Sequence, residues 1–273
     1  MKYIIQLITL IAFVFSVNTA LAKGGHNPPP APEPVNLMNV VTVSEENGDF
    51  DSLIDALDSI GDAAEDNQYV IQIGPGVYDI GNAQIIMKPW VLIQGAGRSF
   101  TVIRGSRASS ADENQAAMVL GADKAALLRM GIENTGAGLL YSIGIRNDNA
   151  SPVIKHVKVY VVGSVNNVGI SNHNNSKPAI ENVKVFAGTG VVVDNSSPFI
   201  LDSVLNGSLP DQYSDGGPGL KLIDSPDSRA VNNMITAGVE VVGVLLSVTP
   251  TSASICRGNY NRDLEDVDCP STP

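Results

Sequence analysis

Four copies of one residue pattern occupy the stretch from Tyr141 to Ile235 and limit the folds that are open to this chain. Each copy has a glycine, a short run of alternating apolar residues, a cluster of Asn, Asp and Ser, and a second alternating run. The copies are GIRNDNASPVIKHVKV (Gly144–Val159), GISNHNNSKPAIENVKV (Gly169–Val185), GVVVDNSSPFILDSVL (Gly190–Leu205) and GLKLIDSPDSRAVNNMI (Gly219–Ile235). The glycines are 25, 21 and 29 residues apart, which is a spacing typical of solenoid proteins.

Apolar residues recur at every second position within the copies, as in Val157 and Val159 or Val183 and Val185. This period predicts strands, and the Asn and Asp clusters suit the tight corners between them. A single coil of this kind has no partner for its apolar face, so the coils must stack on one another.

Residues 1–22 have the pattern of a secretory signal peptide. Lys2 is basic, Ile4–Val17 is apolar, and Ala20-Leu21-Ala22 is a small-x-small cleavage site. The Pro/Gly-rich stretch 23–38 follows as an extended spacer, and residues 39–273 form the predicted folded domain. We therefore expect a secreted protein, extracellular or periplasmic, with no membrane insertion after the signal is removed.

The two cysteines of the chain, Cys256 and Cys269, lie close together near the C-terminus. In an exported protein such a pair predicts a disulfide, here one that closes a 14-residue loop. A loop of this length contributes roughly 3 kcal/mol by the chain-entropy estimate.

A strand is predicted over Val40–Val43, and a helix from about Phe50 to Ala64. Apolar residues at Leu53, Leu57 and Ile60 lie on one face of this helix, and Ser52 with Asp55 would form a capping box. The first coil of a solenoid leaves apolar surface and strand edges open, so we interpret this helix as its N-terminal cap.

The first half of the chain resembles the pectinesterases. The segments GDFDSLIDAL (Gly48–Leu57), YVIQIGPGVYDI (Tyr69–Ile80), VLIQGAGRSFTVIRG (Val91–Gly105) and ALLRMGIENTGAG (Ala126–Gly138) occur in the order and spacing of that family. The resemblance implies the pectin-lyase-like superfamily. The predicted fold is therefore all-β: a single-stranded right-handed parallel β-helix of about seven coils with an N-terminal capping helix.

The catalytic segments of the pectinesterases are missing from this sequence. Neither the Gln-Asp-Thr segment, nor the Asp-Phe-Ile-Phe-Gly strand, nor the Gly-Arg-Pro-Trp segment is present. No catalytic residue is carried over, and we expect no pectin methylesterase activity.

One column of turn residues is the best candidate site in the sequence. Counting back six residues from the strand positions Ile154, Ile180, Ile200 and Ala230 gives Asp148, Asn174, Asp194 and Asp224. These residues would form either a polar turn ladder or a ligand-binding column. Asp194 and Asp224 would then lie in neighbouring coils, where their repulsion would be relieved by divergence of the side chains into solvent, by protonation of one carboxylate, or by weakly bound calcium. No other cofactor is indicated.

An insertion between the third and fourth copies supplies a second candidate, in which Tyr213 is flanked by Asp211 and Asp215 and would stack on a sugar ring. An unliganded turn is the alternative. Of the histidines, His156 is placed in a strand and His173 in a turn. No Ser or Cys is visibly paired with either, so both are assigned structural or solvated roles.

The net charge of −11 argues against nucleic acid and anionic lipid as partners. The leading functional hypothesis is a non-catalytic or degenerate carbohydrate-associated protein that binds a polysaccharide or another extracellular partner. The alternatives are a polysaccharide lyase or hydrolase that uses the turn carboxylates, and a structural or self-associating solenoid. The sequence does not indicate an oligomeric state.

Overall fold

The computed structural model describes residues 39–207, 209, 216–225, 228–242 and 255–257. All of them belong to one compact unit, Asn36–Pro273. The predicted signal peptide and spacer lie outside the described residues.

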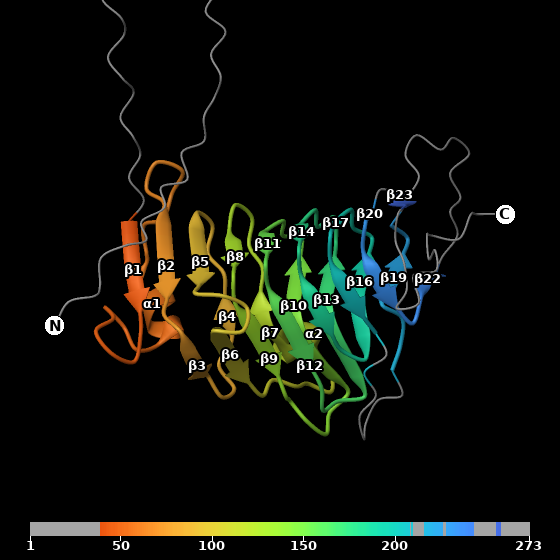
Figure 1. Cartoon of the computed structure of the whole chain (residues 1–273), viewed down its shortest axis with the longest axis horizontal. Helices are drawn as coiled ribbons and strands as arrows, with labels where there is room; N and C mark the ends of the chain where they lie inside the picture. Colours follow the sequence, from red (N-terminus) through yellow and green to blue (C-terminus); the bar gives the residue numbers. More distant parts are fainter. Residues whose placement is uncertain (1–38, 208, 210–215, 226–227, 243–254, 258–273) are drawn as a thin grey trace, which may run out of the picture. The chain divides into compact units, whose positions relative to one another are not determined.

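Three parallel sheets build this unit, and the chain passes through them in turn, once per coil (Figure 1). Sheet I contains β1 (Asn39–Val43), β2 (Tyr69–Ile73), β5 (Val91–Gly95), β8 (Ala126–Leu128), β11 (Val153–Lys155), β14 (Ala179–Glu181), β17 (Phe199–Leu201), β20 (Arg229–Val231) and β23 (Ile255–Arg257). Sheet II contains β3 (Gly76–Asp79), β6 (Thr101–Gly105), β9 (Gly131–Asn134), β12 (Lys158–Val161), β15 (Lys184–Phe186), β18 (Val204–Asn206) and β21 (Met234–Thr236).

Sheet III contains β4 (Ile85–Ile86), β7 (Ala117–Leu120), β10 (Tyr141–Asp148), β13 (Asn166–His173), β16 (Thr189–Asp194), β19 (Leu220–Ile223) and β22 (Val239–Val242). Each strand pairs in parallel with the strand three elements further along the chain through most of the solenoid. The unit is thus an all-β, right-handed parallel β-helix of about seven coils, which confirms the predicted fold class.

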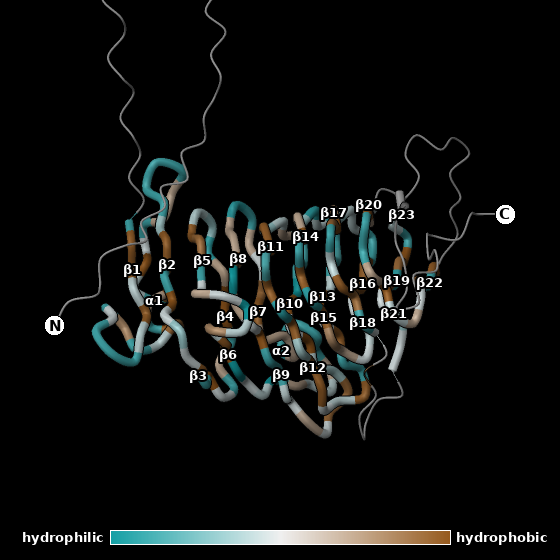
Figure 2. The backbone as a smooth tube through the Cα atoms, in the orientation of Figure 1, coloured by the Kyte–Doolittle hydropathy of each residue, from teal (hydrophilic) through white to brown (hydrophobic). Residues whose placement is uncertain are grey.

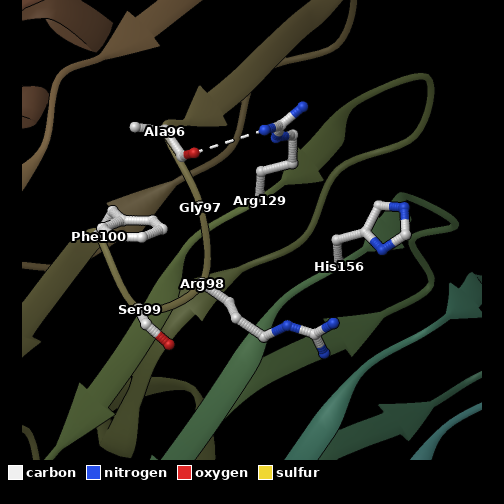
Figure 3. A pocket seen from close by; sticks show the side chains of 7 residues that line it. All are labelled: Ala96, Gly97, Arg98, Ser99, Phe100, Arg129 and His156. Carbon is white, nitrogen blue, oxygen red and sulfur yellow. Dashed lines mark hydrogen bonds between the residues drawn. The ribbon is translucent and has the colours of Figure 1, made fainter.

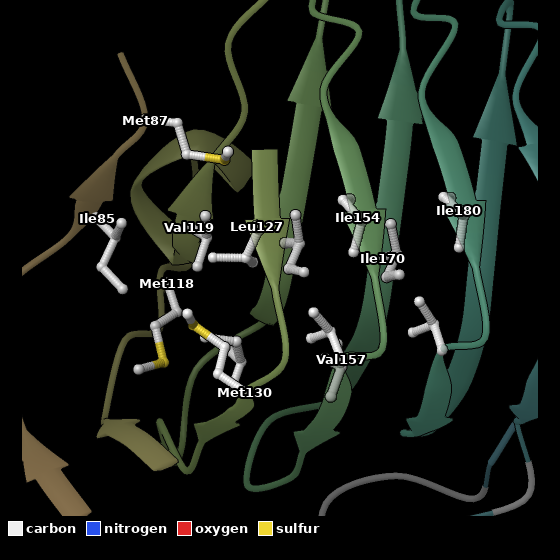
Figure 4. Close-up of a cluster of buried hydrophobic side chains, with 14 of the residues drawn as sticks. Ile85, Met87, Met118, Val119, Leu127, Met130, Ile154, Val157, Ile170 and Ile180 are labelled. Atoms are coloured by element: carbon white, nitrogen blue, oxygen red, sulfur yellow. The ribbon is translucent and has the colours of Figure 1, made fainter. Parts of the chain in front are cut away.

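The core is built from inward-facing aliphatic side chains that stack in register from coil to coil. In sheet I the column is Ile71, Ile93, Leu127, Ile154, Ile180 and Ile200, each at most 1% exposed. Figure 4 shows Leu127, Ile154 and Ile180 within this interior, and Figure 2 shows apolar and polar residues alternating along the coils. Each such side chain contributes roughly 1.5–3 kcal/mol by its burial.

The glycine that opens each repeat is required by the close approach of neighbouring coils. A Cβ placed on Gly169 would lie 2.6 Å from the carbonyl oxygen of Gly190 and would overlap Val185. A Cβ on Gly144 would likewise lie 2.6 Å from the carbonyl oxygen of Gly169. Any side chain here would push two coils apart, and this explains why the repeat keeps glycine at this position.

The predicted N-terminal cap is present as helix α1 (Leu53–Ser59), which packs beside β1 and β2. Its capping contact is confirmed, because the Ser52 hydroxyl oxygen accepts a hydrogen bond from the backbone N–H of Asp55 at 3.3 Å. The predicted end at Ala64 is wrong. The backbone is already extended at Ile60, and the ammonium group of Lys88 binds the carbonyl oxygens of Leu57 and Ile60 at 2.7 and 2.8 Å.

A second, four-residue helix, α2 (Glu113–Ala116), was not predicted from the sequence. The Asp112 carboxylate caps it by accepting from the backbone N–H of Asn114 at 2.8 Å. The helix packs against β10 of sheet III, so it covers part of the outer surface of that sheet. Within the described residues, no helix has the length and apolar character needed to cross a membrane.

Candidate functional site

The corner between sheets I and II is two residues long in five successive coils, and its first residue has a left-handed backbone each time. These residues are Arg129, His156, Asn182, Asp202 and Asn232, with φ between 50° and 58°. Asn, Asp and His adopt this conformation more readily than Arg does. Arg129 is therefore the unusual residue of the five, and because such residues are often kept for function, its corner points to a binding surface.

Neighbouring corners are held one strand spacing apart by backbone hydrogen bonds. The N–H of Arg129 donates to the carbonyl of Lys155 at 3.1 Å, and the N–H of His156 donates to that of Glu181 at 3.1 Å. The side chains of the corner residues therefore follow one another along the solenoid at about 4.8 Å intervals.

One connection between these sheets is longer. Residues 96–100 join β5 to β6 and lie beside the corner column, where they enclose a pocket of about 450 Å³ (Figure 3). We call it the corner pocket. Its lining residues are Ala96, Gly97, Arg98, Ser99, Phe100, Arg129 and His156.

The corner pocket is lined by two arginines and a histidine and by no carboxylate. Arg98 is held in place because its guanidinium donates to the Asn182 side-chain oxygen at 3.1 Å, and Arg129 donates to the Ala96 carbonyl at 3.5 Å. Within the described residues, the imidazole of His156 has no hydrogen-bond or ion-pair partner. Glu181, whose backbone carbonyl accepts from the N–H of His156, has its carboxylate paired with Lys155 at 2.8 Å.

Phe100 adds an apolar surface to this basic site. Its side chain is 69% exposed, which is the highest exposure of any large hydrophobic residue in the described part of the chain. An aromatic ring left in water beside free hydrogen-bond donors is typical of a surface that stacks on a ligand. The arrangement suits a small anion that carries an apolar face.

A second group of polar residues lies on the outer surface of sheet III. We call it the sheet III cluster; it consists of Glu113, Arg146, Asp148, Ser171, His173 and Asp194. Arg146 is 8% exposed and is paired with the carboxylates of Glu113 and Asp148. It also donates to Asn114 of α2 at 2.8 Å, so the cluster ties α2 to the sheet.

The pKa values in this cluster follow from burial and neighbouring charge. Burial, reinforced by the Arg146 guanidinium, holds the pKa of His173 below its ordinary value. For Asp148, burial acts to raise the pKa, but the hydrogen bond from Asn174 and the charge of Arg146 outweigh it and lower the pKa overall.

The predicted turn column is only partly correct. Asp148 and Asp194 do occupy one row of sheet III, but the residue between them is His173, and the partner of Asp194 in the next coil is Ile223. Asn174 and Asp224 lie one position further along. The turns after β13 and β19 have five residues whereas those after β10 and β16 have four, so counting back six residues shifted the register.

The placement of Asp194 and Asp224 at equivalent corners of neighbouring coils is therefore wrong, and the calcium hypothesis loses the geometry on which it was based. Asn174 still contacts another member of the predicted column, because its side-chain amide donates to the Asp148 carboxylate at 2.6 Å. In the described part of the chain, no group of three or more His, Cys, Asp or Glu residues is placed to hold a metal ion.

Both histidine assignments need correction as well. His156 lies in a corner rather than in a strand, and His173 is the last residue of β13, where its Nε2 is 2.6 Å from the Ser171 hydroxyl oxygen. The residues Asp211, Tyr213 and Asp215 lie outside the described residues. So does Cys269, and the disulfide stays a prediction.

Sequence reasoning missed Arg98 and Arg129, and it dismissed His156. One signal was available: when the repeats are aligned on their buried corner residues Val157 and Val183, His156 falls at the same position as Asn182. A basic residue in place of a turn-forming Asn would have indicated that this corner has a further role.

The comparisons with known proteins agree with the architecture. The solved structure of a pectin methylesterase from Aspergillus niger, in deglycosylated form, is 13% identical in sequence and covers 81% of this chain and 70% of its own, with a TM-score of 0.52. The two chains therefore share a parallel β-helix fold.

Two further pectin methylesterase structures show more distant likeness to this β-helix. The enzyme from Yersinia enterocolitica is 13% identical over 78% of this chain and 89% of its own, with a TM-score of 0.49. The enzyme from Erwinia chrysanthemi is 14% identical over 74% of this chain and 80% of its own, with a TM-score of 0.47. No protein-family model and no curated protein sequence matches the chain. At 13% identity, the likeness to the Aspergillus niger structure shows the fold alone and leaves the activity open.

Proposed function

We propose that this protein is a secreted β-helix protein that binds acidic carbohydrate through the corner pocket. The observation that supports it most directly is the set of three basic side chains, Arg98, Arg129 and His156, around a pocket with no carboxylate in its lining. The chain as a whole carries a net charge of −11 and repels anions over most of its surface. The basic lining of the corner pocket therefore makes this pocket the favoured place for an anionic ligand.

The chemistry of the pocket fits an acidic sugar better than a simple inorganic anion. Guanidinium groups bind carboxylates in a bidentate manner, and an exposed aromatic ring packs against the apolar face of a sugar. Arg98 and Arg129 supply the first kind of contact, and Phe100 supplies the second. A uronic acid residue or a sulfated sugar offers both partners at once.

Calorimetric titration of oligogalacturonides and of neutral oligosaccharides into the protein tests this proposal. Arg129→Asn is the most informative variant, since Asn already occupies the equivalent corner at 182 and tolerates the left-handed backbone there. We expect it to weaken binding of the acidic oligomer about tenfold or more, in line with the loss of a charge-assisted hydrogen bond.

Arg104→Gln is the matched control. It removes the same charge from a residue that is outside the pocket and paired with Glu133 at 2.9 Å. Its affinity should equal that of the unchanged protein. Equal affinities for the acidic and neutral oligomers, or an equal loss in both variants, would overturn the proposal.

Export is part of the same proposal, because an acidic polysaccharide is met outside the cytoplasm. Cleavage after Ala22 would leave Lys23 at the N-terminus of the mature protein. Intact-mass measurement on secreted material checks this, and a chain that still begins at Met1 would contradict it.

A further inference from the structure

Two residues of β13 and one of β16 form a chain of contacts on the outer surface of sheet III, and none of the three lines the corner pocket. The hydroxyl oxygen of Ser171 lies 2.6 Å from Nε2 of His173. The other ring nitrogen, Nδ1, lies 3.3 Å from a carboxylate oxygen of Asp194. A hydroxyl, an imidazole and a carboxylate in this order are the parts of a serine nucleophile with its base and the group that orients the base.

The parallel register of sheet III produces this arrangement. Ser171 and His173 are two apart on one strand, so their side chains lie on the same outer face. Asp194 is the register partner of His173 in the next coil, which places its carboxylate beside the imidazole. Because the strands are held on both sides, the three side chains do not need a loop to bring them together.

The surroundings favour the reactive protonation states. A guanidinium nitrogen of Arg146 donates to the Ser171 hydroxyl oxygen at 3.5 Å, and a cation at that distance stabilises the alkoxide. His173 faces Glu113 of α2, Arg146 and Asp148 of β10, and Asp194 of β16. Burial is the largest influence on His173; it lowers the pKa, so the imidazole is neutral at pH 7 and free to accept a proton.

We propose that Ser171, His173 and Asp194 hydrolyse an ester through a serine-bound acyl intermediate. The Ser171 oxygen attacks the ester carbonyl carbon while its proton moves to Nε2 of His173. The bond to the alkoxy oxygen then breaks, and that oxygen leaves as the alcohol with the proton from His173. Water next attacks the acyl carbonyl carbon and gives a proton to Nε2 of His173. The bond between the acyl carbon and the Ser171 oxygen then breaks, the serine oxygen takes the proton back from His173, and the carboxylic acid leaves.

The geometry also restricts the substrate class. Ser171 is only 2% exposed, and Arg146, which is held by Glu113 and Asn114 of α2, lies beside it. The hydroxyl is therefore accessible only to a small acyl group, which would bind against the Arg146 guanidinium. The rim carries the carboxylates of Glu113, Asp148 and Asp194, so it repels anionic acyl groups. The expected substrates are short, uncharged acyl esters such as acetyl esters.

Labelling of the native protein with a small fluorophosphonate, followed by peptide mapping, tests the nucleophile without any substitution. We expect the label on Ser171. The rate of p-nitrophenyl acetate hydrolysis should fall at least a hundredfold in Ser171→Ala. It should stay unchanged in the control Ser59→Ala, an exposed serine of α1 that belongs neither to the sheet III cluster nor to the corner pocket. Absence of label on Ser171 would overturn the proposal, as would an unchanged rate in a folded Ser171→Ala protein.

The pH profile separates catalysis from a merely structural role for His173. The rate should rise with pH through the lowered pKa of His173 and level off near neutral pH, and His173→Gln should abolish this rise. Asp194→Asn should reduce the rate while the label on Ser171 is kept, because Asp194 only orients the imidazole. A rate that is independent of pH, or that is retained in His173→Gln, would contradict the proposed base.

Discussion

Arg98 donates a hydrogen bond of 3.1 Å to the side chain of Asn182, although the two residues are 84 positions apart in the chain. Four stacked coils bring them together, since the corners of Arg129 and His156 lie between the loop that carries Arg98 and the corner of Asn182. The corner pocket therefore depends on the regular stacking of these coils. Arg98, one of its two arginines, is held by Asn182, which is not itself a lining residue.

Replacing Asn182 by glycine should weaken the proposed ligand binding without unfolding the protein. Glycine accepts the φ of 52° at this corner, so the only loss is the side-chain contact with Arg98. A hydrogen bond of this kind is worth about 1 kcal/mol, which corresponds to roughly fivefold in affinity. Calorimetric titration with an oligogalacturonide measures the affinity of the variant. Asn232→Gly, at an equivalent corner without this contact, is the control and should bind as the unchanged protein does.

Gly169→Ala should destabilise the fold by about 1–3 kcal/mol, because the added methyl group overlaps the neighbouring coil. Gly61→Ala is the matched control, since a Cβ there meets nothing within 4 Å. Urea unfolding followed by circular dichroism gives both free energies. Equal midpoints for the two variants would show that the coils have room for a side chain at the repeat glycine.

The free energy of unfolding should fall as the pH drops below 6.5. Burial and Arg146 lower the pKa of His173 in the folded state, so the unfolded chain takes up a proton at a higher pH than the folded chain does. The stability contributed by neutral His173 is thus complete above its unfolded pKa and is lost as the pH falls toward the folded pKa. His173→Gln should flatten the curve in this window. A curve of unchanged slope in that variant would contradict the assignment.

Cys269→Ser should lower the stability of the C-terminal region by roughly 3 kcal/mol if the predicted disulfide closes its loop. The backbone of Cys256 lies in β23, at the end of sheet I, so the bond would secure the last strand of that sheet. The β-type circular dichroism should persist, because the other coils do not depend on the loop. Titration of free thiols in the secreted protein decides the matter, and two reactive thiols would exclude the bond.

Calcium titration should give the same heat for the unchanged protein and for an Asp194→Asn, Asp224→Asn double variant. The two carboxylates are out of register, since the partner of Asp194 in the next coil is Ile223, and Asp194 instead faces His173. If the unchanged protein releases or absorbs heat on calcium binding and the double variant does not, the calcium hypothesis is restored. The turn would then bring Asp224 back toward Asp194.

The sequence alone determined the architecture, because the β-helix repeats its constraints in every coil. Alternation at Val157 and Val159 predicted strands, and the recurring glycines predicted stacked coils. The N-terminal cap was predictable for the same reason, since Ser52 and the apolar face of Leu53 and Leu57 are local signals. Its end was not, because Lys88 from a later coil binds the final carbonyl groups.

The tertiary structure decided which residues meet, because contacts between coils depend on turn lengths that periodicity does not specify. One additional residue in the turn after β13 placed His173, and not Asn174, beside Asp194. In the same way, the five-residue connection before β6 brought Arg98 and Phe100 to the corner of Arg129 and His156. A shift of one residue exchanges the groups that face each other across a sheet, so the chemistry of both sites depends on register and not on composition.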